Sequence, residues 1–305
     1  MSDLPLTEQR NPSTTELDQL GTADLLHRIN DEDRRVAWAV EREIDAIASA
    51  VDAIADRLRT GGHVHYFGAG TSGRLSMLDA AEIPPTFSTP SDMFVAHIAG
   101  GRQALTEAVE GAEDDERSGA DEAGASGIGS GDAVIGLSAS GGAPYVLGAL
   151  RAAGSAGALT IAVTNTPRSP LAALAHIAIT PLAGPEVLTG STRLKAGSAQ
   201  KFVLNMLSTA VMVKLGKVHG NWMVDVRPTN AKLRARAVRI VADLSGSSEA
   251  DANARLSAND WRVRSAIVEL KFGCSSDEAV RRLADANGSL RAALEKGGAP
   301  SAAKS

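Results

Sequence analysis

The sequence predicts an α/β protein with a five-stranded parallel sheet flanked by helices and a small C-terminal three-helix module. Three observations support this fold class. Short β-type runs recur at the spacing of βαβ units, Ala- and Leu-rich helical stretches lie between them, and the composition becomes charged and helical after Pro228. The predicted strands are residues 63–67, 93–98, 132–137, 158–164 and 176–182.

The N-terminal part precedes the first predicted strand. Residues 1–32 are polar and predict an arm rather than a domain. In residues 33–60 the apolar side chains recur at steps of four and three, which predicts one helix that Gly61 and Gly62 end. In the sheet that follows, right-handed crossovers bring the carboxyl ends of the strands to one edge, where ligands bind.

The C-terminal part has a different pattern. A long, largely buried helix is predicted over residues 195–215, and the sheet domain is assigned to residues 33–227. Residues 228–300 are predicted to form the three-helix module together with a helix that connects it to the sheet domain. The predicted helices there are residues 230–244, 249–256, 261–270 and 276–284.

Composition excludes several classes of protein. Of the 305 residues, 44% are apolar and 22% are charged, which is typical of a folded globular protein. The net charge of -5 offers no basic field for a polyanion, so we expect no nucleic acid partner, whereas a small anion could bind locally. Cys274 is the only cysteine, which excludes an intramolecular disulfide and fits a reducing cytoplasm. No secretion signal and no apolar run of about 18 residues is present, so we expect no membrane insertion.

The first predicted strand is followed by a loop, residues 68–74, that reads GxGxxG. A dinucleotide site would also need an acid at the end of the second strand, but Asp92 precedes that strand. A P-loop would need a lysine here, and the first lysine of the chain is Lys195. The remaining interpretation is a phosphate site, where Gly70, Thr71 and Ser72 begin a helix and offer backbone N–H groups and hydroxyls.

A second hydroxyl-rich loop follows the third predicted strand and contains Ser138, Ser140 and Gly141. Either loop alone is explained equally well as a helix cap or a turn, because Ser, Thr and Gly favour such positions. Two such loops at one edge of a sheet, without the acid or lysine of a nucleotide site, favour a phosphomonoester site. The six histidines show no metal-ligand spacing, so they predict no metal site.

These residues resemble a known family. The segments GAGTSGR (68–74), SASGG (138–142) and TGSTRLKAGSAQK (189–201) resemble sugar isomerase (SIS) domains, which implies a flavodoxin-like sheet that binds phosphosugars. Four further blocks are similar to the N-acetylmuramic acid 6-phosphate etherases. They are INDED (29–33), FGAGTSGRLSMLDAAEIPPTF (67–87), EGAEDD (110–115) and LNMLSTAVMVKLGKVHGNWMVDV (204–226). The resemblance covers nearly the whole chain, and the C-terminal module is similar to a ubiquitin-associated module.

The resemblance implies cleavage of the lactyl ether at C3 of the phosphorylated amino sugar, which gives N-acetylglucosamine 6-phosphate and D-lactate. Opening the sugar to its aldehyde makes the C2 proton acidic and places the ether oxygen β to a carbonyl. Elimination then needs a base at C2 and an acid at the ether oxygen, and water adds to the resulting alkene. Two carboxyl groups suffice for this chemistry, so we expect no metal and no redox cofactor.

The resemblance assigns these roles to Glu82, as proton donor, and Glu113, as base or activator of water. Independently, Glu82 is expected at the end of a helix before Pro84 and Pro85, where the helix dipole disfavours a carboxylate and raises its pKa. The alternative for both residues is a solvated surface charge. Secondary candidates are Glu186, Ser191 and Lys195; for Glu186 the alternative is a charge that caps a strand end.

Two other functions stay open on the sequence. An aldose-ketose isomerase of the same fold would share the enolate-type intermediate but would release no lactate. A sugar-phosphate-sensing regulator, such as the glucokinase regulatory protein, would need no catalytic acids, but that protein carries two SIS domains. The resemblance further implies a homodimer with residues 195–215 near the contact. Whether the chain serves peptidoglycan recycling or the use of external muramic acid is open.

Overall fold

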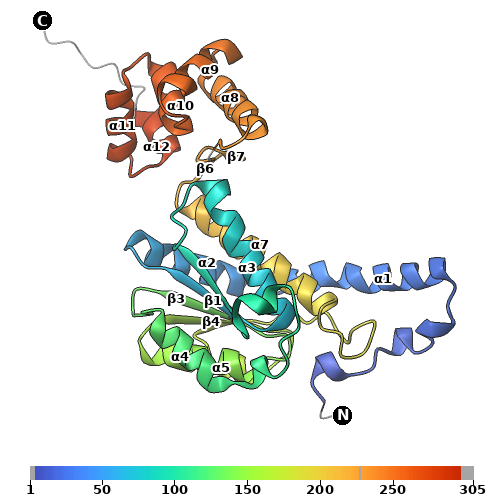
Figure 1. Ribbon diagram of the computed structural model, residues 1–305. Helices are drawn as coiled ribbons and strands as arrows, with labels where there is room; N and C mark the ends of the chain where they lie inside the picture. Colours follow the sequence, from blue (N-terminus) through green and yellow to red (C-terminus); the bar gives the residue numbers. More distant parts are fainter. Residues whose placement is uncertain (1–3, 227, 297–305) are drawn as a thin grey trace, which may run out of the picture. The chain divides into compact units, whose positions relative to one another are not determined.

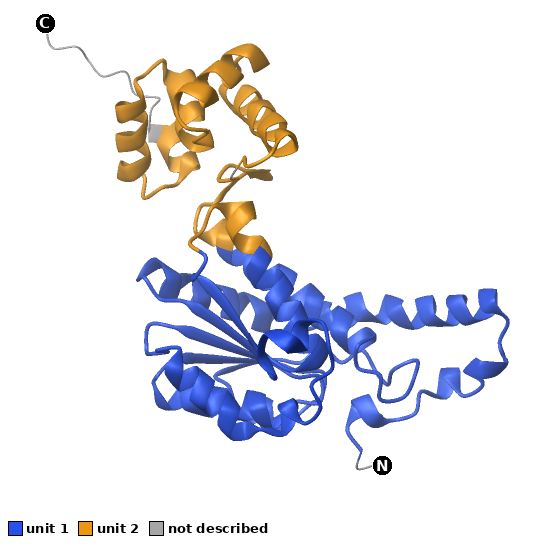
Figure 2. Cartoon of the chain, in the orientation of Figure 1, with its two compact units in different colours: residues 1–81, 91–211 blue, residues 82–90, 212–305 orange. Residues whose placement is uncertain are grey.

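The computed structural model describes residues 4–226 and 228–296 and divides into two units (Figure 2). The first unit contains residues 4–81 and 91–211, and the second contains residues 82–90 and the described part of 212–305. Parts of the three predicted segments, namely residues 1–3, 227 and 297–300, lie outside the described residues. No helix of the described chain is both long enough and apolar enough to span a bilayer.

The first unit is built on a five-stranded sheet in the order β2-β1-β3-β4-β5, with every neighbouring pair parallel (Figure 1). The strands are β1 (Val64–Gly68), β2 (Phe94–Ile98), β3 (Ala133–Leu137), β4 (Leu159–Val163) and β5 (Ile177–Ile179). The three central strands are buried along their whole length, as expected for a parallel sheet covered on both faces. The predicted fold class is confirmed.

The edge strand β5 is shorter than predicted. Pro181 has no N–H for the ladder, and the backbone N–H of Thr180 instead donates to the Glu43 carboxylate at 2.7 Å. The chain therefore leaves the sheet after Ile179. Helices cover both faces of the sheet: α4 and α5 lie on one face, and α2, α3 and α7 on the other (Figure 1). The helices around the sheet are α2 (Ile44–Arg59), α3 (Gly70–Phe87), α4 (Glu116–Ala125), α5 (Pro144–Ser155), α6 (Pro170–Leu174) and α7 (Lys195–Lys214).

The N-terminal part differs from the prediction. Instead of one helix over residues 33–60, α1 (Thr22–Glu41) is followed by α2, with a break at Arg42 and Glu43. The apolar stripe continues across the break, so periodicity alone does not detect it. Glu43 has a non-helical backbone conformation at the break, and its carboxylate accepts the hydrogen bond from the backbone N–H of Thr180. Before α1, the arm forms the short 3-10 helices η1 (Leu6–Glu8), η2 (Pro12–Thr14) and η3 (Leu17–Gln19).

Two glycines let α4 and α5 pack unusually closely. A Cβ on Gly119 would lie 1.9 Å from the carbonyl oxygen of Tyr145, and one on Gly148 would lie 2.0 Å from that of Glu116. Any larger residue would force the two helices apart. This contact matters because α4 is preceded by η5 (Ala112–Asp114), whereas α5 follows the second hydroxyl-rich loop. A further 3-10 helix, η4 (Gly101–Leu105), follows β2.

The second unit is helical around its own core, which includes Ile240, Val241, Leu256 and Ile267. Its helices are α8 (Ala231–Ser245), α9 (Glu249–Ala258), α10 (Val263–Phe272), α11 (Ser276–Asp285) and α12 (Leu290–Lys296). The first four correspond to predicted helices, whereas α12 was not predicted. A two-stranded hairpin, β6 (Val218–His219) and β7 (Trp222–Met223), was also not predicted.

Candidate active site

A cavity of about 490 Å³ lies in the first unit at the carboxyl ends of β1 and β3. Both hydroxyl-rich loops line it, as the sequence predicted for the edge where ligands bind. The polar lining residues are Glu8, Thr71, Ser72, Glu113, Asp114, Ser138, Ser140 and Thr192. None of the residues that line this cavity is a lysine, an arginine or a histidine.

The first loop turns sharply from β1 into α3. A Cβ on Gly68 would lie 2.7 Å from the backbone nitrogen of Gly73, and Gly70 has a positive φ of 51°. Glycine is therefore required for this approach. The turn places Gly70, Thr71 and Ser72 at the first turn of α3, where N–H groups have no partner within the helix and attract anions. The Ser72 hydroxyl is already engaged, because it donates to Oε1 of Gln200 at 2.8 Å.

The second loop presents its serine hydroxyls in a defined orientation. Oγ of Ser138 accepts from the backbone N–H of Gly141 at 3.1 Å, and Oγ of Ser140 accepts from that of Gly142 at 3.2 Å. Because both oxygens accept locally, their O–H protons can be donated to a ligand. Gly141 does not line the cavity but shapes the turn, since its φ is 69° and a Cβ there would lie 2.2 Å from Oγ of Ser169.

Carboxylates line the same cavity as the hydrogen-bond donors of the two hydroxyl-rich loops. Glu113 and Asp114, on η5, line the cavity, so the structure brings Glu113 together with both predicted phosphate loops. Glu8, from η1 of the N-terminal arm, lines it too, and its Oε2 would lie 3.3 Å from a Cβ on Gly190. Sequence reasoning missed Glu8, because nothing in a polar arm shows which of its acids will reach a loop far away along the chain.

Glu82 is placed differently. It is exposed, it lies about three turns along α3 from Thr71, and it is not among the residues that line the cavity. The expectation that Pro84 and Pro85 end this helix is wrong, since α3 continues through both of them to Phe87. Proline lacks the N–H that would bond four residues back, so the helix loses hydrogen bonds here, and the division between the two units falls just before Glu82.

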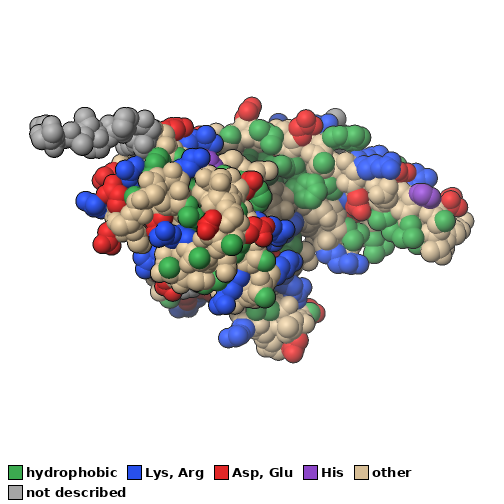
Figure 3. Space-filling view, turned by 90° about the horizontal axis from the view of Figure 1, so that it is seen from above, with side chains coloured by type: hydrophobic (Ala, Val, Ile, Leu, Met, Phe, Trp, Pro, Cys, Tyr) green, Lys and Arg blue, Asp and Glu red, His purple; other side chains and the backbone are tan. Residues whose placement is uncertain are grey.

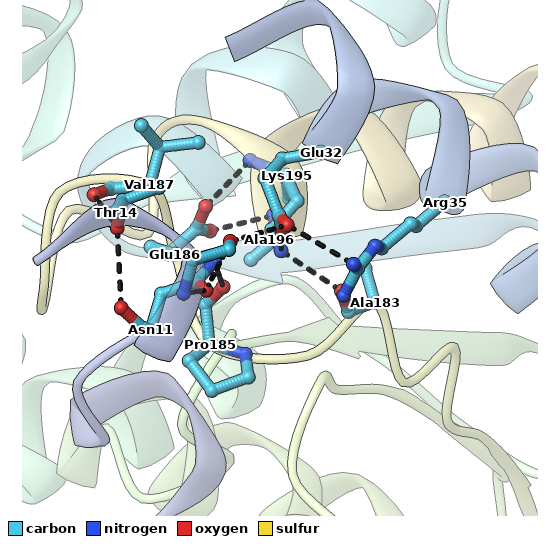
Figure 4. A network of polar contacts seen from close by, with 11 residues as sticks. Asn11, Thr14, Glu32, Arg35, Ala183, Pro185, Glu186, Val187, Lys195 and Ala196 are labelled. Carbon is cyan, nitrogen blue, oxygen red and sulfur yellow. Dashed lines mark hydrogen bonds and ion pairs between the residues drawn. The ribbon is translucent and has the colours of Figure 1, made fainter. Parts of the chain in front are cut away.

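The three secondary candidates lie outside the cavity lining. The Glu186 carboxylate accepts from the backbone N–H groups of Lys195 and Ala196 at 2.9 and 2.8 Å, so it caps the N-terminus of α7 (Figure 4). Burial raises the pKa of Glu186, although these two hydrogen bonds oppose the shift. Ser191 is half-buried and uses its N–H for the carbonyl of Leu188, whereas its neighbours Gly190 and Thr192 line the cavity.

Lys195 belongs to a buried network that fastens the arm to the sheet domain (Figure 4). Its ammonium donates to Oε2 of Glu32 at 2.5 Å and to the carbonyl of Ala183 at 3.0 Å, and both side chains of the pair are buried. Burial pushes the pKa of Glu32 upward, but hydrogen bonds from Lys195, Ser13 and Asn11 hold it below its ordinary value. The Lys195 charge is thus compensated within the fold.

The arm is fastened by further side-chain hydrogen bonds. Asn11 donates to the carbonyl of Pro185 at 3.1 Å, and Thr14 donates to that of Val187 at 2.8 Å (Figure 4). Ser13 donates to the Glu32 carboxylate at 2.9 Å. These contacts join residues that are far apart in sequence, and they fix the segment that carries Glu8.

A second polar cluster lies between the sheet and helices α4 and α5. Nδ1 of His65 is 3.2 Å from Nε2 of His97, Nδ1 of His97 is 3.0 Å from Oε1 of Glu122, and the Tyr145 hydroxyl donates to Oε2 of Glu122 at 2.5 Å. Burial, followed by the charge of His97, lowers the pKa of His65 to about 4. Both histidines are buried, and neither lines the candidate cavity. The described residues contain no group of three or more His, Cys, Asp or Glu placed to hold a metal.

Comparison with known proteins identifies the family. The profile of the glucokinase regulatory protein N-terminal SIS domain matches residues 46–154, and that of the SIS domain matches residues 115–210. The chain is 51% identical over 290 residues to the N-acetylmuramic acid 6-phosphate etherase of Cronobacter sakazakii, covering 95% of this chain and 98% of that protein. It is 52% identical over 291 residues to the enzyme of the same name from Mycolicibacterium smegmatis, with the same coverage.

Among solved structures, a phosphoheptose isomerase from Neisseria gonorrhoeae is 17% identical with a TM-score of 0.49, covering 62% of this chain and 97% of that one. The family assignment rests on the etherase relatives, since they are identical to the chain at about half of the aligned positions over 95% of its length. The chain belongs to the N-acetylmuramic acid 6-phosphate etherase family.

Proposed function

We propose that this chain is a carbon-oxygen lyase that cleaves the D-lactyl ether of N-acetylmuramic acid 6-phosphate and yields N-acetylglucosamine 6-phosphate and D-lactate. The observation that carries the proposal is the cavity itself. It combines two hydroxyl-rich loops at the start of helices with the carboxylate of Glu113, in a chain whose relatives carry this etherase name. Phosphate recognition and acid-base groups are the two requirements of the reaction.

The 6-phosphate binds at the two loops. The N-terminus of α3 offers backbone N–H groups, and the hydroxyls of Thr71, Ser138 and Ser140 donate hydrogen bonds. Since the lining residues include no cation, neutral donors and the helix dipole carry the recognition of this anion. The phosphate thereby fixes the open-chain sugar with its reacting carbons toward the carboxylates.

Glu113 takes the C2 proton of the aldehyde form, and the electron pair forms an enolate. The bond between C3 and the ether oxygen then breaks as this oxygen takes up a proton, so that D-lactate leaves and an alkene remains. The family resemblance assigns the donor role to Glu82, although this residue is exposed and lies outside the cavity lining. Water adds its hydroxyl to C3, C2 regains a proton, and N-acetylglucosamine 6-phosphate results. The sequence of steps balances without a metal or a redox partner.

The direct test is to incubate the purified chain with N-acetylmuramic acid 6-phosphate and measure D-lactate. We expect lactate release with this substrate and a loss of several orders of magnitude in kcat/KM with unphosphorylated N-acetylmuramic acid, since three hydrogen bonds to a charged group, each worth about 1.5–3 kcal/mol, are removed. Ketose formation without lactate would indicate an isomerase instead. Binding without any turnover would indicate a regulator.

A homodimer and a cytoplasmic location complete the proposal. Phe202 and Met206 are one helical turn apart on α7 and are 42% and 38% exposed, which supports a protein contact on this helix. On the face seen in Figure 3, charged side chains of both signs are interspersed. Sedimentation of the chain and of a Phe202→Glu variant tests the assembly: the variant should shift toward the monomer, and a monomeric parent chain would exclude it.

A further inference from the structure

A smaller cavity of about 200 Å³ adjoins the larger one in the same unit. The two cavities share the lining residues Ala69, Gly70 and Glu113, so Glu113 stands at their junction. The smaller cavity is well below the roughly 300–1,000 Å³ of sites that hold drug-sized ligands. It is suited to one small group that projects from a ligand bound in the larger cavity.

Arg74 supplies the only cation among the residues that line either cavity. Its Nε donates to the carbonyls of Ala104 and Leu105 at 2.9 and 3.3 Å, and its Nη2 donates to the carbonyl of Glu107 at 2.8 Å. These bonds fix the plane of the guanidinium, while its Nη1 makes no hydrogen bond to the described residues. The side chain is thus oriented and still has N–H groups to offer.

The rest of the lining is of two kinds. Small apolar side chains, among them Ala99, Ala108 and Val109, form one part of the wall. Glu107 and Glu110 also line the cavity, so an anionic group would be repelled except on the side of Arg74. Glu113 adds a third carboxylate to this lining. A group that fits is therefore small, has an apolar portion, and can carry a negative charge only where it meets Arg74.

We infer that this cavity binds the lactyl group, with its carboxylate on Arg74 and its methyl group against the alanines and Val109. This inference rests on the proposed function, which supplies a substrate with a three-carbon carboxylate on C3. Arginine pairs with carboxylates through two parallel hydrogen bonds, and such charge-assisted pairs are among the stronger ones. With the sugar in one cavity and the lactyl group in the other, the bond to be broken lies at the junction, beside Glu113.

The test combines a change in the substrate with a change in the enzyme. In the parent enzyme, converting the lactyl carboxylate of N-acetylmuramic acid 6-phosphate to its primary amide should lower kcat/KM by about 10- to 100-fold. In Arg74→Gln, the acid and the amide should be cleaved at similar rates. Arg102→Gln, in η4 and outside both cavity linings, is the matched control and should keep the parent ratio of acid to amide.

Binding of N-acetylglucosamine 6-phosphate, which has no lactyl group, should be unchanged in Arg74→Gln and reports an intact sugar site. If that variant does not fold, Arg74→Lys replaces it and should reduce the acid-to-amide ratio at least threefold. Equal cleavage of acid and amide by the parent enzyme, or a parent-like ratio in a folded Arg74 variant, overturns the inference. Absence of lactate release from the acid in the parent enzyme overturns the proposed function instead.

Discussion

Removing the Lys195 ammonium tests whether this lysine serves the fold or the substrate. In Lys195→Met, the Glu32 carboxylate keeps its hydrogen bond from Ser13 and an ion pair with Arg35 at 3.3 Å, but the Arg35 side chain is half exposed. Breaking a buried pair from one side costs about 3–5 kcal/mol, and the remaining partners place the expected loss near the lower end. A loss of about 3 kcal/mol corresponds to a melting temperature lower by about 6–12 °C.

The assay is thermal unfolding followed by circular dichroism, paired with lactate release at 25 °C. Arg35→Met, which removes the exposed partner of the same carboxylate, should cost at most about 1 kcal/mol. The double variant Glu32→Gln/Lys195→Met should recover much of the stability, because no uncompensated charge stays buried. If Lys195→Met unfolds like the parent chain yet releases no lactate, the lysine acts on the substrate and not on the fold.

Three further predictions concern the site and its surroundings. In deuterated water, Glu82→Gln should still exchange the C2 proton, but its rate of lactate release should fall by about 10²- to 10⁴-fold. In Glu113→Gln, the rates of exchange and of lactate release should both fall by about this factor. The opposite exchange pattern would reverse the two roles. Glu8→Gln should lower kcat/KM about tenfold, because it removes a hydrogen bond between the Glu8 carboxylate and the substrate. Glu16 is exposed on the same arm and does not line the cavity, so Glu16→Gln should leave kcat/KM unchanged. Equal effects of the two variants would exclude a role of Glu8 in the site. The pKa of His65 is about 4 in the folded chain and about 6.5 in an unfolded chain, so between these pH values only the unfolded chain takes up a proton. The free energy of unfolding therefore falls as the pH is lowered from about 6.5 toward 4, by about 2 kcal/mol at pH 5. Urea unfolding of His65→Asn should lack this loss, and an unchanged pH profile would argue against it.

The strands and the two phosphate loops could be predicted because their signals are local. A buried strand needs a short apolar run, and a tight turn into a helix needs glycine, serine or threonine at set positions. The sharp turn after β1 is an example, since the close approach that requires glycine at Gly68 involves Gly73, five positions away, and Gly70 is needed for its positive φ. The loops therefore lie where they were expected, on one edge of the sheet.

Features set by distant contacts could not be predicted. The break between α1 and α2 depends on Glu43 reaching Thr180, and the place of Glu8 depends on Asn11 and Thr14 binding residues more than 170 positions away. The spacing of apolar residues along the sequence gives no information about such long-range hydrogen bonds. The course of α3 was mispredicted for another reason, because Pro84 and Pro85 lie within a helix that tolerates the hydrogen bonds they remove.

The fastening of the N-terminal arm has a practical consequence for handling the protein. A polar N-terminal segment of this kind is often deleted before crystallisation or used to attach an affinity tag. Deleting residues 1–14 would remove Glu8 from the cavity wall together with the hydrogen bonds of Asn11, Ser13 and Thr14, and it would leave Glu32 with fewer donors. Kinetic constants measured on a preparation shortened in this way would then describe an altered cavity.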